Sequence, residues 1–167
     1  MKTSDHHKEQ LNKIREKIQS IDIAMLTTQD REEHLRSRPM QTLKMDEDGS
    51  LWFFTKSPSP KSQEIDFHHN VNLSYADPKT HTYVSVTGVA GIVEDEQLNK
   101  KLWNPVYQAW FPAGLEDPEL KLLKVKMHTA EYWDTTSSEM VRLFKLVDAI
   151  LSGEPYKAGE NTKISNE

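Results

Sequence analysis

The stretch that decides the fold runs Arg38-Pro39-Met40-Gln41, then Ser50-Leu51-Trp52-Phe53-Phe54-Thr55, then Ser59-Pro60-Lys61. Apolar and β-branched residues predict one strand from Pro39 to Met45 and a second from Ser50 to Thr55. The intervening turn ends in Gly49, which suits a hairpin. A helix should follow at once, with Ser59 as its N-cap and Pro60 in its first turn, and run to about Asn70.

This arrangement would place polar groups near the start of a helix. A helix N-terminus carries partial positive charge and unpaired N–H groups, so it suits an anion. Arg38, Thr55, Ser59 and Lys61 could therefore converge on a phosphate, which suggests a phosphorylated cofactor. The same residues also fit a surface arginine beside an ordinary capped helix, and spacing alone leaves both interpretations open.

The rest of the chain mixes strands with short helices. Alternating patterns predict strands at 21–28, 71–75, 82–93, 120–127 and 130–134, the last two joined by a turn at 128–129. Residues 29–37 are charged and are expected to form a loop. Gly88 and Gly91 suggest bulges or close backbone packing. Strands that arrive as hairpins and meanders favour the α+β class, with an antiparallel sheet closed into a small barrel.

Three helices are expected outside the deciding stretch. The first carries Leu11, Ile14, Ile18 and Ile21 at three- and four-residue spacing. The second is capped by Asp95, and its apolar stripe is formed by Leu98, Leu102, Val106 and Trp110. The third begins at Ser137 or Ser138. We expect one domain over residues 1–152 and a polar, flexible C-terminal tail over residues 153–167.

Composition narrows the function classes. The 167 residues carry a net charge of −5 and no cysteine, which argues against nucleic acid or anionic membrane as partners and rules out thiolate chemistry. No signal core or membrane span is visible, so we expect a soluble cytoplasmic protein. The seven histidines show no metal-binding spacing, and no metal is expected. No serine hydrolase, P-loop or Rossmann motif is present.

Several runs, in order and spacing, resemble the general stress protein 26 group of the pyridoxamine 5′-phosphate oxidase-like, FMN-binding split-barrel superfamily. The likeness extends from about Glu9 to Trp133. It rests on residues 37–40, 51–55 and 59–61 and on four further runs. These runs are Val84-Ser85-Val86-Thr87-Gly88, Leu102-Trp103-Asn104-Pro105, Ala109-Trp110-Phe111-Pro112 and Ala130-Glu131-Tyr132-Trp133-Asp134. The resemblance implies an antiparallel six-stranded split β-barrel with peripheral helices.

The resemblance also implies a homodimer that binds FMN, or FAD in its place, between two subunits. Arg38 matches the basic residue that opens the flavin-binding strand, and Pro39, Met40 and Gln41 would run alongside the isoalloxazine. Phe54 and Thr55 match an aromatic–threonine pair, and Ser59 and Lys61 match the phosphate-binding helix start. Tyr83 and Ser85 would reach the flavin from the other subunit. Trp103, Trp110 and Trp133 are typical of core or dimer packing, with Trp110 expected nearest the flavin.

Two departures limit what is carried over. Pro60 stands where oxidases often have a basic residue, so one phosphate contact is missing. No arginine-containing segment that completes the oxidase site follows Trp133; Arg142 lies in the predicted last helix. Pyridoxamine phosphate oxidation is therefore not expected. Three hypotheses remain. The first is a flavin oxidoreductase of unknown substrate and electron donor, and the second is a flavin protein without turnover that acts as a stress-linked carrier, sensor or scavenger. The third is a barrel that has lost its flavin and binds another planar ligand such as haem, or nothing, although no histidine is suited to be an axial haem ligand.

Overall fold

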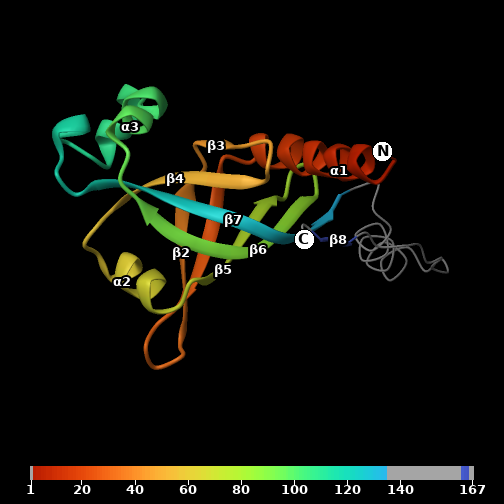
Figure 1. The fold of residues 1–167 in the computed structure, drawn as a ribbon, viewed down its shortest axis with the longest axis horizontal. Coiled ribbons are helices and arrows are strands. Elements are labelled where there is room, and N and C mark those ends of the chain that lie inside the picture. Colours follow the sequence, from red (N-terminus) through yellow and green to blue (C-terminus); the bar gives the residue numbers. More distant parts are fainter. Residues whose placement is uncertain (1, 135–162, 166–167) are drawn as a thin grey trace.

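The computed structural model describes residues 2–134 and 163–165 (Figure 1). It contains one curled antiparallel sheet in the order β2-β1-β5-β6-β7-β4-β3, with β8 paired to β7. The strands are β1 (Ile23–Gln29), β2 (Leu35–Gln41), β3 (Lys44–Met45), β4 (Ser50–Lys56), β5 (Asn70–Asp77), β6 (Thr82–Val93), β7 (Leu120–Trp133) and β8 (Lys163–Ser165). The helices are α1 (Lys2–Gln19), α2 (Pro60–Phe67), α3 (Glu96–Leu102), η1 (Pro105–Ala109) and η2 (Gly114–Glu116).

The first helix buries its apolar residues, whereas the first strand leaves two of its own exposed. Leu11, Ile14 and Ile18 of α1 are buried against the sheet, as their helical spacing predicts. In β1 the buried residues include Ala24 and Leu26, while Ile23 and Met25 are 44% and 41% exposed. Ile23 and Met25 therefore face outward, which leaves an apolar strip on the outer face of the sheet.

The predicted hairpin is wrong in its first half. β2 pairs with β1 along its whole length, from Ile23 opposite Gln41 to Gln29 opposite Leu35. Of the predicted first strand, only the part in β3 pairs with β4. The chain changes partner at Thr42, whose N–H donates to the Asp22 carbonyl at 2.8 Å. β2 also begins at Leu35, so the predicted loop ends earlier than expected.

The predicted turn at 128–129 is also wrong, because β7 is continuous from Leu120 to Trp133. Its pairing with β6 shifts register between Thr87 and Gly88, so a bulge takes up the irregularity. A Cβ on Gly88 would lie 2.2 Å from the Lys126 carbonyl oxygen, which confirms close backbone packing there. Gly91 has nothing within 4 Å of the equivalent position, so the expectation fails at that residue.

The helix capped by Asp95 ends sooner than its apolar spacing predicts. The Asp95 carboxylate accepts the Leu98 N–H at 2.9 Å, as expected of an N-cap, but α3 stops at Leu102. Asn104 precedes Pro105, and a residue before proline is driven out of the helical region. Val106 and Trp110 consequently lie in and after η1, where they are 56% and 60% exposed.

The described sheet has eight strands, two more than expected, counting the two-residue β3 and the β8 segment that lies inside the predicted tail. The helix expected from Ser137 or Ser138 falls outside the described residues. Within the described part of the chain, no helix is long and apolar enough to cross a membrane.

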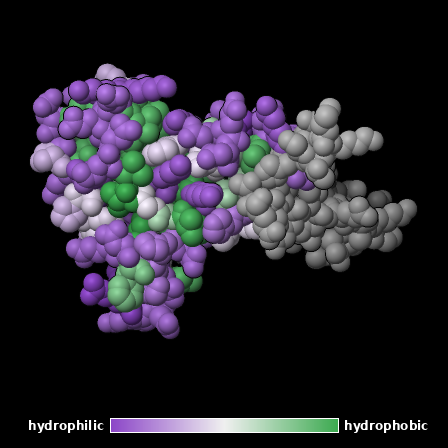
Figure 2. All heavy atoms as spheres, viewed as in Figure 1, coloured by the Kyte–Doolittle hydropathy of each residue, from purple (hydrophilic) through white to green (hydrophobic). Residues whose placement is uncertain are grey.

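Buried side chains form two clusters. The larger fills the space between α1 and the curled sheet; the smaller surrounds Phe54 and Phe111 where α3, η1 and β4 meet. Figure 2 shows that hydrophobic residues also reach the surface in the middle of one face, among hydrophilic ones. The smaller cluster lies beside a cavity, which Phe54 and Phe111 help to line.

Candidate functional site

A cavity of about 470 Å³ opens beside the smaller core cluster, and we call it the main cavity. Its lining is mostly apolar and comes from β1, β2, β4, the start of α2 and the η1 region. It contains eight of the eleven residues that the sequence nominates for cofactor binding: Pro39, Met40, Gln41, Phe54, Thr55, Ser59, Lys61 and Trp110. Segments distant in sequence thus meet at one concave surface, which is the usual form of a small-molecule site.

One wall of the main cavity is aromatic. Phe54 is buried, and its ring lies 5.4 Å from the ring of Tyr107 and 6.1 Å from that of Phe111 in edge-on geometry. Trp103 supports the same cluster from behind, 5.6 Å from Phe54. Trp110 lines the mouth and keeps most of its surface exposed. A rigid wall with one exposed indole suits a flat, partly apolar ligand.

The opposite end is polar because α2 begins there. Ser59 has an extended backbone and caps the helix: its Oγ accepts the Ser62 N–H at 3.1 Å, and the Ser59 N–H donates to Ser62 Oγ at 2.8 Å. This reciprocal cap fixes the start of the helix next to Thr55, which is buried in the cavity lining. The N-terminal dipole of α2 therefore points into a polar corner.

Lys61 supplies the positive charge of this corner. Its Nζ lies 3.3 Å from Met40 Sδ, a weak acceptor that leaves ammonium N–H capacity for a ligand. Burial and the nearby Arg38 together lower the pKa of Lys61 to about 8, against the opposing effect of Glu64. A phosphate placed here would gain a charged hydrogen bond and would restore the pKa of the lysine toward its ordinary value.

Arg38 does not line the main cavity. Its Nη1 donates to Thr28 Oγ1 at 2.6 Å and its Nη2 donates to Glu64 Oε2 at 2.7 Å. The arginine is thus close enough to influence the pKa of Lys61 but is engaged by a carboxylate. Its assigned contact with a cofactor stays a prediction.

Tyr83 and Ser85 also lie away from the main cavity, on β6. Ser85 Oγ accepts a hydrogen bond from Asn72 Nδ2 at 2.9 Å. The sequence nominates these two residues as contributions from another subunit, and that role stays a prediction.

Five lining residues were missed by the sequence analysis: Ile23, Leu43, Lys56, Tyr107 and Phe111. Lys56 directly follows the nominated Phe54-Thr55 pair, so its position in the run was an available signal. Tyr107 gave no comparable signal, because the predicted helix did not break at Pro105. Among residues 2–134 and 163–165, no group of three or more His, Asp or Glu side chains is arranged to hold a metal ion.

The family model described as "Pyridoxamine 5′-phosphate oxidase like" matches residues 9–157. The chain belongs to this family. A structure of a protein related to general stress protein 26, from Clostridium acetobutylicum, superimposes with a TM-score of 0.70 over 95% of each chain at 16% identity, which confirms the α+β split-barrel fold.

Relatives with higher identity support the nominated group. Protein bli-3 of Neurospora crassa is 28% identical over 169 residues, covering 95% of this chain and 81% of the relative. General stress protein 26 of Bacillus anthracis is 28% identical, with a TM-score of 0.61 over 71% of this chain and 92% of that one. The general stress FMN/FAD binding protein of Xanthomonas citri is 27% identical, with a TM-score of 0.64 over 78% and 92%. The resemblance to the general stress protein 26 group is confirmed.

Proposed function

We propose that this chain binds FMN in the main cavity, with FAD as the alternative flavin, and that it is a flavin-dependent oxidoreductase of the cytoplasm. One observation carries the proposal: a single cavity joins a polar, cationic corner at Ser59 and Lys61 to an aromatic wall around Phe54. That combination matches a cofactor with a phosphate at one end and a flat ring at the other. The Xanthomonas citri relative, described as an FMN/FAD binding protein, supports the choice of flavin.

The two ends of the main cavity would bind different parts of the cofactor. Lys61, Ser59 and Thr55 would hold the phosphate, with the nearby Arg38 as a further anchor. Pro39, Met40 and Gln41 of β2 would lie beside the ring. The bound flavin supplies hydride or electron transfer, and the protein supplies binding, orientation and electrostatics. The described residues offer no side chain that stands out as a general acid or base, which keeps a carrier, sensor or scavenger without turnover as the second candidate.

We further propose that two copies of this chain form the complete site. Cross-strand neighbours place Pro39, Met25, Ser74 and Ser85 on one face of the sheet, in that order across β2, β1, β5 and β6. Three strand spacings put Ser85 about 14 Å from Pro39 within one subunit. Ser85 and Tyr83 would therefore meet a flavin bound near Pro39 most easily from a partner seated on this face, where Ile23 and Met25 are exposed.

The first test separates the phosphate anchor from the rest of the site. Replacing Lys61 with Ala should weaken FMN binding by about tenfold or more, because a charged hydrogen bond is lost, and should leave riboflavin nearly unaffected. Quenching of flavin fluorescence measures both. Lys100→Ala, in the exposed last turn of α3, is the matched control. Equal losses for both flavins would contradict the anchor assignment, and a protein indifferent to either flavin would refute the proposed function.

A second experiment distinguishes an enzyme from a carrier. The FMN-loaded protein is mixed with NADH or NADPH without oxygen, and the flavin absorbance is followed. Bleaching with either donor supports an oxidoreductase. A flavin that binds tightly and is not reduced by either favours the non-catalytic candidate.

A further inference from the structure

A buried carboxylate lies behind the polar corner of the main cavity. Glu64 of α2 is 8% exposed, and its Oε2 accepts two hydrogen bonds, from Thr28 Oγ1 at 2.6 Å and from Arg38 Nη2 at 2.7 Å. Arg38 Nη1 also donates to Thr28 Oγ1, so the three side chains form a closed triangle. Burial raises the pKa of Glu64, but the hydrogen bonds from Thr28 and Arg38 and the positive charges of Arg38 and Arg36 together lower it overall, so the group is ionised at neutral pH.

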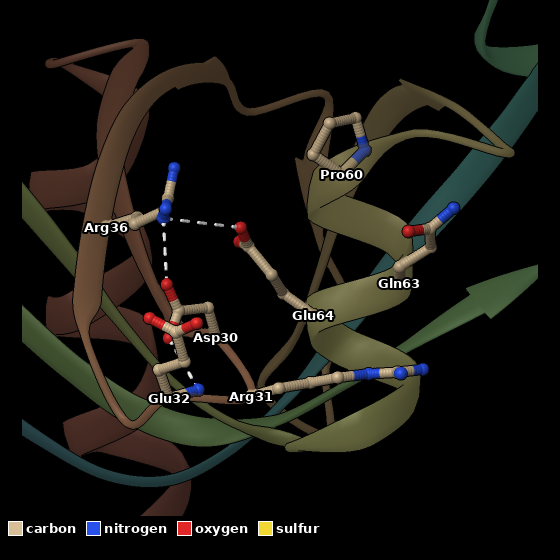
Figure 3. A pocket seen from close by; sticks show the side chains of 7 residues that line it. All are labelled: Asp30, Arg31, Glu32, Arg36, Pro60, Gln63 and Glu64. Carbon is tan, nitrogen blue, oxygen red and sulfur yellow. Dashed lines mark hydrogen bonds and ion pairs between the residues drawn. The ribbon is translucent and has the colours of Figure 1, made fainter.

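The other carboxylate oxygen faces a second, smaller cavity of about 300 Å³, between the β1–β2 loop and α2, which we call the loop-side cavity (Figure 3). Arg36 Nε lies 3.8 Å from Glu64 Oε1 and 3.1 Å from Asp30 Oδ2. In Figure 3 dashed lines join Arg36 of β2 to both of these carboxylates. Glu64 therefore has two arginine neighbours, Arg38 at hydrogen-bond distance and Arg36 just beyond it.

Glu64 also influences the proposed phosphate anchor. It follows Lys61 by three residues on α2, and its negative charge raises the pKa of Lys61 while Arg38 lowers it. Arg38, Lys61 and Glu64 thus share one electrostatic environment. The positive charge that Arg38 would offer a phosphate is largely cancelled by the carboxylate it already binds.

We propose that Glu64 competes with the cofactor's phosphate for Arg38 and thereby keeps flavin phosphate binding weak and exchangeable. This inference rests on the proposed function. When phosphate attracts Arg38, Arg36 is positioned to take over as the counter-ion of Glu64, so no buried charge is left alone. Glu64 is a positioning residue that acts through Arg38, and it lowers the preference of the site for FMN over riboflavin.

The decisive variant is Glu64→Gln. Both hydrogen bonds converge on one oxygen, so the single amide oxygen of glutamine can accept them, and the substitution removes the charge while keeping the triangle. We expect FMN to bind about three- to tenfold more tightly, since one repulsive charge near the phosphate is gone, with riboflavin unchanged. Asp66→Asn, which removes an exposed charge from the same helix, is the matched control and should change neither affinity.

A surface variant tests the same idea without altering a buried group. Arg36→Gln removes the alternative counter-ion, so Glu64 should hold Arg38 more strongly and FMN should bind about threefold more weakly, with riboflavin unaffected. Arg31→Gln, in the same loop-side cavity, removes an equal charge and contacts the Phe67 ring instead of Glu64. A smaller loss of FMN affinity in Arg31→Gln than in Arg36→Gln would show that the effect comes from the lost contact with Glu64 and not from a general loss of positive charge.

The outcomes are distinguishable. An FMN-to-riboflavin preference that is unchanged or lowered in Glu64→Gln would overturn the inference, because it would show that the carboxylate does not compete with the phosphate for Arg38. Equal effects of Arg36→Gln and Arg31→Gln would overturn it as well, even where Glu64→Gln does not fold. A wild-type protein that binds neither flavin would instead refute the proposed function.

Discussion

At the scale of single residues, Lys61 determines how the site responds to its surroundings. The amine is partly buried next to Arg38, and this combination, rather than the residue type, brings its pKa to about 8. Surface lysines titrate far higher and would keep their charge at any physiological pH. A lysine that loses its proton just above neutrality would make binding of the proposed flavin phosphate sensitive to pH in a range where binding of riboflavin would not be.

The affinity for FMN should therefore fall as the pH rises above 8. Phosphate raises the pKa of Lys61, so above pH 8 binding must take up a proton, and the affinity should decrease by up to about tenfold per pH unit. Below pH 8 the free site is already protonated and the affinity should level off. Fluorescence titrations between pH 6.5 and 9 measure this.

Two comparisons control the pH prediction. Riboflavin affinity should stay flat, because no phosphate is present. Lys61→Arg keeps its charge over the whole range and should give an FMN affinity that does not depend on pH. An undiminished slope in Lys61→Arg would assign the pH dependence to another group, with Arg38 and Glu64 as the charged neighbours that face Lys61.

At the scale of elements, local patterns were readable and pairing partners were not. The Ser59 cap, the β6 boundaries and the Asp95 cap follow from residues a few positions apart, and the structure confirms them. The pairing of β2 with β1 is set by the change of partner at Thr42, and no short-range rule predicts it. Arg38 faced the same difficulty, since Thr28 and Glu64 lie 10 and 26 residues away.

The residues of the main cavity were predicted more completely than the pairing of the strands. Eight nominated residues line the main cavity because they come from runs that the family resemblance had already placed together. Of the five missed lining residues, Tyr107 and Phe111 depend on η1, a segment that the apolar spacing predicts as a continuing helix. The helix-capping pattern and the family resemblance therefore located the polar corner, whereas Tyr107 and Phe111 of the aromatic wall were missed.

The close approach of β6 and β7 at the bulge can be tested by substitution of a single glycine. Gly88→Ala would force a Cβ to within 2.2 Å of the Lys126 carbonyl oxygen, and backbone cannot move aside as a flexible side chain can. We expect the free energy of unfolding to fall by about 1–3 kcal/mol. Gly91→Ala, in the same strand with open space around it, should change it by no more than about 0.5 kcal/mol. Urea denaturation compares the two, and similar values would contradict the close approach at the bulge.

At the scale of the whole molecule, the outer face of the sheet carries both an apolar strip and part of the nominated site. Met25 lies opposite Pro39 on one side and Ser74 on the other, and Ser74 lies opposite Ser85. In a two-fold dimer the same patch is used by both subunits, so a change at Met25 acts twice. Assembly and cofactor binding should then be lost together.

If the proposed dimer forms, Met25→Lys should convert it into monomers, because the substitution would bring two like charges into an apolar contact. FMN affinity should fall in parallel, since Tyr83 and Ser85 of the second subunit would no longer reach the flavin. Sedimentation velocity gives the assembly state, and fluorescence quenching gives the affinity. Gln97→Lys, which adds the same charge to the exposed face of α3, should alter neither. A wild-type chain that sediments as a monomer and still binds FMN would show that one subunit forms the whole site.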